Sequence, residues 1–410
     1  MSSAIGIDFG TSNTAAAILT DGRSRIVPLE AGQETLPTAI FLDYGARHTV
    51  FGSAAVRSMI DGKEGRFMRA LKSILGTPLA RERRQFLNRR LTLLEIITEF
   101  LAEIRERAEA AEGVSFRRVA AGRPVRFHSA DPCRNAQAEA DLKECYHAAG
   151  FDEIRFVNEP EAAARAAGPG RGIGLIVDIG GGTSDFTLFE SRGGAVQILA
   201  SHGIRLGGTD FDKALSLEKV MPLLGLGGAL RNEIGPGLHD VPRALFHDLA
   251  GWEKIAFLYG PATLRNVKGM ARLAVEPQRL NRLVRVIENE IGHDVAFAVE
   301  AAKIGANGGT EAGIDLGLVE QGLRPVLTAT ELVCALHPSA RSIRTAVGEV
   351  LALAGIGGDR VGRVIFVGGS SLLSGIEAEV RAALPGAGVE RSDVFTAVVR
   401  GLALCTADAD

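Results

Sequence analysis

Apolar residues near the start of the chain form two short runs, at residues 4–7 and 15–19, separated by a glycine-containing polar stretch. Short apolar runs bounded by turn residues are typical of buried β-strands. The stretch between the two runs begins with Asp8 and contains Gly10-Thr11-Ser12-Asn13. The pattern therefore predicts a β-hairpin whose first strand leads into an aspartate.

The same arrangement returns near the middle of the chain. Residues 175–177 are apolar, Asp178 follows, and Gly180-Gly181-Gly182-Thr183-Ser184-Asp185 precedes a second apolar run at residues 186–189. The distance between the two copies is too long for the period of a solenoid repeat. This internal duplication predicts two similar lobes that face each other, each with its own hairpin.

Other stretches have helical periodicity. Apolar residues at a spacing of three or four predict helices at residues 91–111 and 131–150. A longer apolar stripe predicts one continuous helix over 279–303, and a final helix covers 393–405. The arginine-rich run at 81–90 is interpreted as the solvated face of a helix.

The length of the chain sets its domain organisation. The chain has 410 residues, whereas a single hydrophobic core rarely grows beyond about 250–300 residues. We expect an α/β fold of two lobes, with central mixed sheets flanked by helices around a cleft. Lobe I covers 1–168 with a helical insertion at 40–115, and lobe II covers 169–392 with a helical insertion at 212–310. Residues 393–410 form a terminal helix that packs back on lobe I.

Composition excludes several classes of protein. The formal net charge is −3, which gives no global attraction for nucleic acid or for an anionic membrane. No basic segment precedes an apolar N-terminal run, and no run approaches ~18 apolar residues, so we expect neither a signal peptide nor a membrane span. The four cysteines form no C-x-x-C pair and are interpreted as buried, reduced thiols. These features predict a cytoplasmic protein.

The two predicted hairpin turns are candidates for phosphate binding. A tight glycine turn leaves backbone N–H groups pointing outward, and such groups bind phosphate oxygens. Asp8 and Asp178 can hold Mg²⁺ directly or through its waters, and Thr11 and Thr183 offer hydroxyl groups. Either turn alone is equally consistent with a structural turn, but two turns that each follow an aspartate point to a polyphosphate held from both sides.

A third glycine turn, Gly368-Gly369-Ser370, lies between a predicted strand at 363–367 and a predicted helix at 374–384. A nucleotide can pack against such glycines, and a helix N-terminus favours anions. Alone this turn is a weak signal, because any β–α turn can carry two glycines. The chain has no Walker A, G-x-G-x-x-G, H-E-x-x-H or G-x-S-x-G motif, which removes support for P-loop, Rossmann, zinc-protease and serine-hydrolase functions.

Six segments, in a fixed order over almost the whole chain, resemble the nucleotide-binding domain of the DnaK heat-shock chaperone family. They are IGIDFGTSN, NEPEAAA, IVDIGGGTSDFT, GGTDFD, VEAAKI and IFVGGSS. Two further segments, AGRPVRF and VMPLLGLGG, are similar to a truncated, YegD-like subgroup. The resemblance implies a duplicated actin-like ATPase fold, related to ribonuclease H, that binds ATP or ADP with Mg²⁺.

The resemblance also implies roles for single residues around the phosphates. The two phosphate loops are Gly10, Thr11, Ser12 and Asn13, and Gly180, Gly181, Gly182 and Thr183. Asp8 and Asp178 resemble ligands of magnesium-bound water, and Glu159 and Asp185 resemble carboxylates near the metal. Lys72 resembles the lysine that reaches the γ-phosphate and the attacking water. A solvated side chain is the alternative for Lys72, and a simple strand end is the alternative for Glu159.

The adenosine pocket is implied in the same way. Glu300 and Lys303 resemble the pair that clamps adenosine, with Asn307 where a serine is usual. Gly207 and Gly208 belong to the GGTDFD segment, and Gly368, Gly369 and Ser370, within the adenosine motif 364–376, resemble the opposite wall. Glu300 and Lys303 are three residues apart on a predicted helix, so a surface ion pair is the alternative.

The resemblance implies a slow ATP hydrolase that works as a conformational switch for an unidentified protein partner. Because the chain stops at Asp410, we expect it to lack the peptide-binding domain of these chaperones. Two alternatives stay open: a small-molecule kinase of the same superfamily, and a nucleotide-sensing or filament-forming protein. We expect a monomer without nucleic-acid or membrane partners, and the residues do not decide between adenine and guanine.

Overall fold

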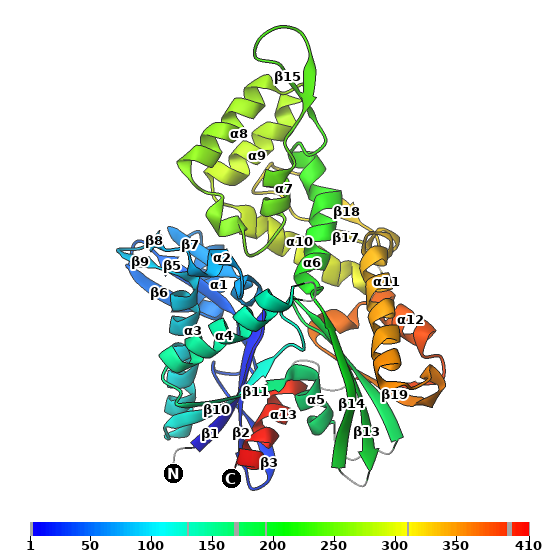
Figure 1. The fold of residues 1–410 in the computed structure, drawn as a ribbon. Helices are drawn as coiled ribbons and strands as arrows, with labels where there is room; N and C mark the ends of the chain where they lie inside the picture. Colours follow the sequence, from blue (N-terminus) through cyan, green and yellow to red (C-terminus); the bar gives the residue numbers. More distant parts are fainter. Residues whose placement is uncertain are drawn as a thin grey trace. The chain divides into compact units, whose positions relative to one another are not determined.

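The computed structural model describes residues 3–128, 131–167, 172–192, 195–309, 311–391 and 396–409 (Figure 1). The chain divides into two compact units. The first comprises Met1–Gly208 with Ala340–Asp410, and the second comprises Thr209–Ser339. This grouping differs from the lobe limits expected at residues 168 and 392, which stay predictions.

The first sheet contains the first predicted hairpin. Its strands are β1 (Ser3–Phe9), β2 (Asn13–Thr20), β3 (Arg23–Val27), β10 (Phe116–Arg123) and β11 (Glu153–Asn158), with the short β4 (Leu36–Pro37) beside β2. They lie in the order β11-β10-β1-β2-β3. β1 pairs antiparallel with β2 and parallel with β10, and β10 pairs parallel with β11. The hairpin predicted at the start of the chain is therefore confirmed.

The second sheet repeats this topology. Its strands are β12 (Gly172–Ile179), β13 (Ser184–Arg192), β14 (Ala195–Ile204), β19 (Val361–Val367) and β20 (Gly388–Arg391), in the order β14-β13-β12-β19-β20. The β12–β13 and β13–β14 pairs are antiparallel, whereas β12–β19 and β19–β20 are parallel. Because order and direction match the first sheet, the predicted internal duplication is confirmed.

Two helices form the layer between the sheets in the first unit. α5 (Glu159–Ala166) and α13 (Ala397–Cys405) pack on each other, and their alanines and leucines share one buried cluster with strand residues of both sheets. Figure 1 draws α13 in red beside α5. The predicted final helix is present but begins at Ala397, and residues 392–395 lie outside the described residues.

Two predicted helices cover the first sheet. α3 (Leu93–Glu112) buries the expected apolar stripe, and Thr92 and Glu95 exchange hydrogen bonds in a capping box at its start. α4 (Pro132–Ala148) follows β10, and Gly150 takes the positive φ that commonly follows a helix end. Both helix predictions are confirmed.

The stretch expected to be a helical insertion at 40–115 contains strands as well as helices. β5 (Ala39–Asp43), β6 (His48–Phe51) and β7 (Gly65–Arg69) form a sheet, with α1 (Ser53–Ile60), η1 (Leu71–Ile74) and α2 (Pro78–Arg81) nearby in the chain. The arginine-rich run is not the face of a helix, because β8 (Arg84–Phe86) and β9 (Arg89–Leu91) form a hairpin there. Leu87 has a φ of 51°, and this left-handed backbone turns the chain.

The second unit is mainly helical, as expected for residues 211–307. Its helices are α6 (Gly208–Leu215, which begins at the limit of the unit), η2 (Ser216–Val220), η3 (Met221–Leu224), α7 (Ala244–Leu249), η4 (Ile255–Phe257), α8 (Pro261–Leu273), α9 (Pro277–Glu288) and α10 (Gly292–Asn307). Its short strands are β15 (Ala229–Arg231), β16 (Leu238–Asp240), β17 (Ala312–Gly313) and β18 (Val326–Leu327). α11 (Ala329–Ala354) contains the second boundary between the units, at Ser339 and Ala340. The remaining elements belong to the first unit and are η5 (Gly358–Arg360), η6 (Gly369–Leu372), α12 (Ser374–Ala383) and η7 (Thr406–Ala409).

The single helix expected over 279–303 is wrong, because α9 and α10 are separate helices. Glu290 takes a positive φ of 57°, which an α-helix cannot continue. The next helix begins at Gly292, which packs tightly against its neighbours. A β-carbon at this position would lie only 2.8 Å from Tyr259 Oη and from Ile255 Cγ2. The apolar stripe continues across the break, and for this reason periodicity alone did not reveal it. Within the described ranges, none of the helices combines the length and apolar character needed to cross a bilayer.

The cysteines divide into two pairs, which corrects the expectation that all are buried. Cys133 and Cys334 are exposed, Cys145 and Cys405 are buried, and all four are free thiols. Burial raises the pKa of Cys145 to about 12. We therefore expect a thiol reagent at pH 8 to modify two thiols in the native protein and four after denaturation, because the thiolate is the reactive form.

Mass spectrometry of the labelled protein checks this prediction. A Cys133→Ser, Cys334→Ser double variant is the matched control and should take up no label while folded. Rapid native labelling of that variant would contradict the burial of Cys145 and Cys405.

Candidate functional site

The two predicted phosphate turns meet in the first unit. A β-carbon built on Gly181 would lie 2.5 Å from Ser12 Oγ and 3.0 Å from Thr11 Cβ. A β-carbon on Gly182 would lie 3.0 Å from Thr11 Oγ1. Any larger residue at these glycines would separate the turns. The structure therefore brings together the two copies of the duplicated hairpin, as the sequence predicts.

Neighbouring backbone holds the second turn in place. The N–H of Gly180 donates to the carbonyl of Thr183 at 3.0 Å, and the N–H of Gly208 donates to the carbonyl of Gly180 at 2.9 Å. A β-carbon on Gly207 would lie 2.6 Å from the backbone nitrogen of Gly182. Gly207 and Gly208, predicted as nucleotide-binding residues, thus pack directly against the second turn.

The third glycine turn lies at the same place. Gly368 follows β19 with a φ of 79°, and a β-carbon there would overlap the Ile179 carbonyl and lie 2.9 Å from Asp178 Oδ1. A β-carbon on Gly208 would overlap the hydroxyl of Ser370. Gly368 and Ser370 therefore lie beside Asp178 and the second turn. The role of the motif 364–376 in binding adenosine stays a prediction.

Four carboxylates gather behind the turns. Asp178 and Asp185 lie directly opposite each other on β12 and β13, whereas the residue opposite Asp8 on β2 is Ala15. Glu159 is the first residue of α5 and is buried. The two hairpins are thus alike in fold but differ in charge, because only the second supplies a pair of aspartates across its strands.

Gly122 makes room for two of these carboxylates and was missed in the sequence. A β-carbon there would lie 3.3 Å from Glu159 Cγ and 3.5 Å from Asp8 Oδ1. Its signal in the sequence is slight, because one glycine at the end of an apolar strand has many explanations. The pairing of β10 between β1 and β11 is what gives this glycine its role.

Lys72 is the cation of the cluster. It lies on η1, is 7% exposed, and its Nζ is 2.6 Å from Glu159 Oε1. Burial opposes the charge on Lys72, but Glu159 and Asp8 attract it and raise its pKa overall. Lys72 is therefore not a solvated side chain, because it forms a buried ion pair with Glu159. The catalytic parts of both residues stay predictions.

If all four carboxylates were ionised, their negative charge would exceed the single positive charge of Lys72, and the pKa values of the three aspartates are raised. Burial and the nearby Glu159 raise the pKa of Asp8 to about 7 and that of Asp185 to about 8, although Val125 N–H donates to Asp185 Oδ1 at 2.8 Å. Burial, Glu159 and Asp185 also raise the pKa of Asp178. Within the described ranges, no three such side chains are arranged to ligate one ion directly. The excess charge fits a hydrated divalent cation, since Mg²⁺ usually keeps several waters.

A small cavity of about 20 Å³ lies where the turns meet Lys72, enough for about one water molecule. Its lining residues are Thr11, Lys72, Ser73, Pro124, Phe127, Gly182, Thr183 and Arg205. Thr11, Lys72, Gly182 and Thr183 were predicted site residues. Ser73, Phe127 and Arg205 were not, because they have no motif of their own and the fold brings them there from distant positions.

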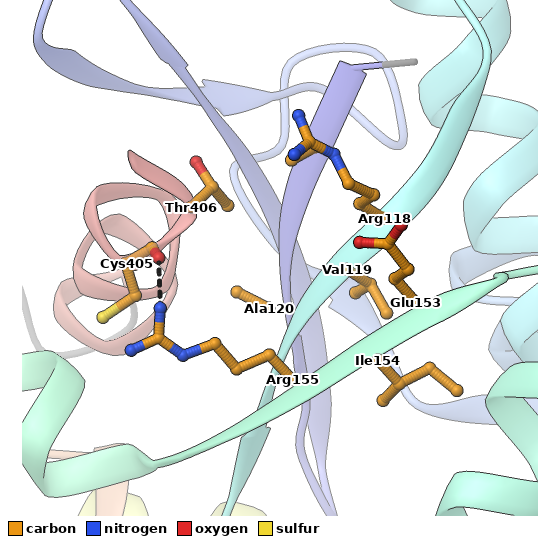
Figure 2. Close-up of a pocket in the computed structure, with 9 residues that line it drawn as sticks. Arg118, Val119, Ala120, Glu153, Ile154, Arg155, Cys405 and Thr406 are labelled. Carbon is orange, nitrogen blue, oxygen red and sulfur yellow. Dashed lines mark hydrogen bonds between the residues drawn. The ribbon is translucent and has the colours of Figure 1, made fainter. Parts of the chain in front are cut away.

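A larger cavity of about 200 Å³ lies elsewhere in the first unit, and its lining shares no residue with the two turns. Figure 2 shows Arg155 reaching across it to the carbonyl of Cys405, with which it forms a 3.0 Å hydrogen bond. Ala120, Ile154 and other aliphatic side chains line much of the remainder. The contact fastens the end of α13 to β11 and has no evident catalytic chemistry.

The predicted adenosine residues Glu300, Lys303 and Asn307 lie on α10 in the second unit. Lys303 is buried, and its Nζ lies 2.7 Å from Asp212 Oδ1. Trp252 Nε1 donates to Asp212 Oδ2 at 3.1 Å. Lys303 is therefore not part of a surface ion pair with Glu300, and its part in nucleotide binding stays a prediction.

Comparison with known proteins gives a consistent result. A family model described as "Hsp70 protein" matches residues 4–220. "Chaperone protein DnaK" of Thermoplasma acidophilum is 34% identical over 224 residues, which are 52% of this chain and 35% of that protein. "Chaperone protein HscA homolog" of Rickettsia akari is 30% identical over 231 residues, 52% of this chain and 37% of that protein. The alignments thus cover only about a third of these relatives.

Proposed function

This chain belongs to the Hsp70 protein family, and we propose that it binds ATP between its two glycine turns and hydrolyses it slowly as a conformational switch. The repeated sheets are the duplicated actin-like ATPase fold of that family. The observation that carries the proposal is the meeting of Thr11 and Gly181–Gly182 beside the buried Lys72–Glu159 pair.

The residues of the chain divide the work of phosphate binding. We assign the phosphates to backbone N–H groups of the two turns, Gly10–Asn13 and Gly180–Thr183, with hydroxyl groups from Thr11 and Thr183. The turns need no positive side chain to bind an anion, because their amide dipoles supply the attraction. The closeness of the turns supports a polyphosphate gripped from both sides rather than two separate anions.

Hydrolysis requires a water molecule to attack the γ-phosphorus. The water oxygen forms a bond to that phosphorus, and the bond from phosphorus to the β–γ bridging oxygen breaks. The electron pair leaves on ADP, and the proton of the water passes to phosphate or solvent. Lys72 neutralises charge that develops on the phosphoryl oxygens, and Glu159 with Lys72 orients the water.

The carboxylate cluster is assigned to Mg²⁺, held mainly through water by Asp8, Glu159, Asp178 and Asp185. When bound, the ion would neutralise phosphate charge and offset the mutual repulsion of these side chains. The high pKa values of Asp8 and Asp185 in the protein alone support this assignment, because buried carboxylates favour a neighbouring cation.

The remaining roles follow from the family and are proposals for this chain. Gly207, Gly208 and Gly368–Ser370 contact the nucleotide, and Glu300, Lys303 and Asn307 bind adenosine. Hydrolysis and product release change the conformation, and an unidentified protein partner reads that change. The chain works as a monomer in the cytoplasm.

Phosphate release by purified protein tests the proposal. We expect release from ATP without any acceptor at on the order of 10⁻² s⁻¹ or slower, the range of unassisted NTPases. A Glu159→Gln variant purified identically controls for contaminating ATPases. Consumption of ATP only when sugars or metabolite pools are added would overturn hydrolysis and identify a kinase, whereas ATP binding without turnover would identify a nucleotide sensor.

A further inference from the structure

Arg205 lines the same cavity as both glycine turns, and we propose that it is a second catalytic cation, an arginine finger supplied by the chain itself. The inference rests on the proposed ATP hydrolysis. Arg205 follows β14 and precedes the Gly207-Gly208 turn. Its cavity neighbours include Lys72, Thr11 and Thr183, so it lies in the same cavity as the lysine that we assign to the transferred phosphoryl group.

Two hydrogen bonds hold the guanidinium group although the residue is exposed. Arg205 Nη2 donates to the carbonyl of Ser73 at 2.9 Å, and Arg205 Nη1 lies 3.3 Å from His128 Nδ1. An unanchored surface arginine loses much conformational freedom when it binds a phosphate. These contacts restrict that freedom before any ligand binds.

His128 is arranged to accept the hydrogen bond from Arg205. Its Nε2 lies 2.7 Å from the carbonyl of Leu75, which can only accept, so Nε2 carries the proton and Nδ1 presents a lone pair. His128 is 6% exposed, and burial together with Arg205 lowers its pKa. The neutral imidazole therefore acts as a positioning residue that fixes the guanidinium plane.

The same short helix positions both cations. Lys72 and Ser73 lie on η1, and Leu75 immediately follows it. The carbonyls of Ser73 and Leu75 fix Arg205 directly and through His128, while Lys72 points its ammonium to Glu159. A single turn of backbone thus sets the spacing of Lys72 and Arg205 in the cavity.

A guanidinium suits the charge that we expect at this position. During hydrolysis charge spreads over the oxygens of the transferred phosphoryl group, and a planar fork of N–H donors can bind two of them at once. Arg205 gives up no proton and forms no covalent bond. It stabilises the negative charge that develops as the bond between the γ-phosphorus and the bridging oxygen breaks, while Lys72 serves the side facing Glu159.

Arginine variants test the assignment by rate and by binding. We expect Arg205→Ala to lower phosphate release by about 30-fold, well below the roughly 10³-fold of a buried arginine finger, because solvent screens an exposed charge. ADP affinity should not change, whereas affinity for a non-hydrolysable ATP analogue should fall about tenfold, because only the analogue has a γ-phosphate. Arg117→Ala, which removes an exposed arginine paired with Asp152, is the matched control and should behave as wild type.

Two further measurements separate a catalytic role from a structural one. Free guanidinium ion should restore part of the rate to Arg205→Ala and none to Arg205→Lys, whose side chain fills the space. His128→Ala should slow phosphate release about tenfold, and adding it to Arg205→Ala should cause no further loss, because both changes remove one interaction.

The outcomes distinguish this inference from the proposed function. If wild type releases phosphate and Arg205→Ala matches it in rate and in analogue affinity, the arginine finger is overturned while hydrolysis stands. If wild type binds nucleotides without turnover, hydrolysis is overturned, and the loss of analogue affinity in Arg205→Ala still supports the contact with the terminal phosphate. If wild type binds no nucleotide, both are overturned.

Discussion

Replacing Lys72 by alanine is expected to lower phosphate release from ATP by about 1,000-fold while ATP binding is retained. The ammonium of Lys72 is buried and lies 2.6 Å from Glu159 Oε1, so it acts where water screens charge poorly. Its removal takes away the positive charge that we assign to the transferred phosphoryl group. Binding persists because the N–H groups of both turns remain.

Single-turnover phosphate release and nucleotide titration measure the two quantities separately. Lys72→Met keeps much of the buried volume, so it distinguishes loss of charge from loss of packing and guards against an unfolded alanine variant. Lys268→Ala removes a lysine from an exposed pair with Glu288 and serves as the matched control. A Lys72→Met rate within twofold of wild type, with ATP bound normally, would show that the lysine is not catalytic.

Replacing Gly401 by alanine is expected to destabilise the protein by about 3 kcal/mol, at the upper end for overpacking. A β-carbon at Gly401 would overlap the carbonyl group of Ala162 on α5. α13 cannot retreat easily toward β1, because a β-carbon on Gly6 of β1 would lie 2.7 Å from the backbone nitrogen of Ala403 on α13. The methyl group therefore forces α5 and α13 apart at the centre of their contact.

Thermal unfolding checks this prediction. For a loss of this size we expect the unfolding temperature to fall by roughly 6–12 °C, if the unit responds like a domain of 150–250 residues. Gly348→Ala is the matched control, because Gly348 lies within α11 and a β-carbon there meets no atom within 4 Å. That substitution should stabilise the helix slightly, and an equal loss in both variants would contradict the proposed close contact.

The sequence was most informative where short-range physics decides the structure. Asp8 and Asp178, each before a glycine turn, mark positions where backbone must turn tightly, and both hairpins formed as predicted. The stripe of α3 is likewise local and was recovered. Lys72 and Glu159 came from a family resemblance, since nothing in their own neighbourhoods requires the buried pair that the fold makes.

The errors arose where tertiary contacts override local pattern. The helices α9 and α10 share one apolar stripe, but the left-handed Glu290 separates them. The arginine-rich run forms a hairpin although its composition also suits a helix. Arg205 and His128 were not identified because they are 77 residues apart in the chain, and only the arrangement of β14 and η1 brings their side chains to one cavity.

The place of α13 has a consequence for biosynthesis. This helix packs on β1, β2, β3 and β10, yet the ribosome makes it almost a whole chain length after β1. The nascent first sheet therefore exposes the apolar surface that α13 later covers, while the second sheet and the second unit are still being translated. Contacts of such long sequence separation slow folding and favour aggregation of intermediates. Nascent chains of this protein should accordingly depend on holdase protection until Ala397–Cys405 has left the exit tunnel.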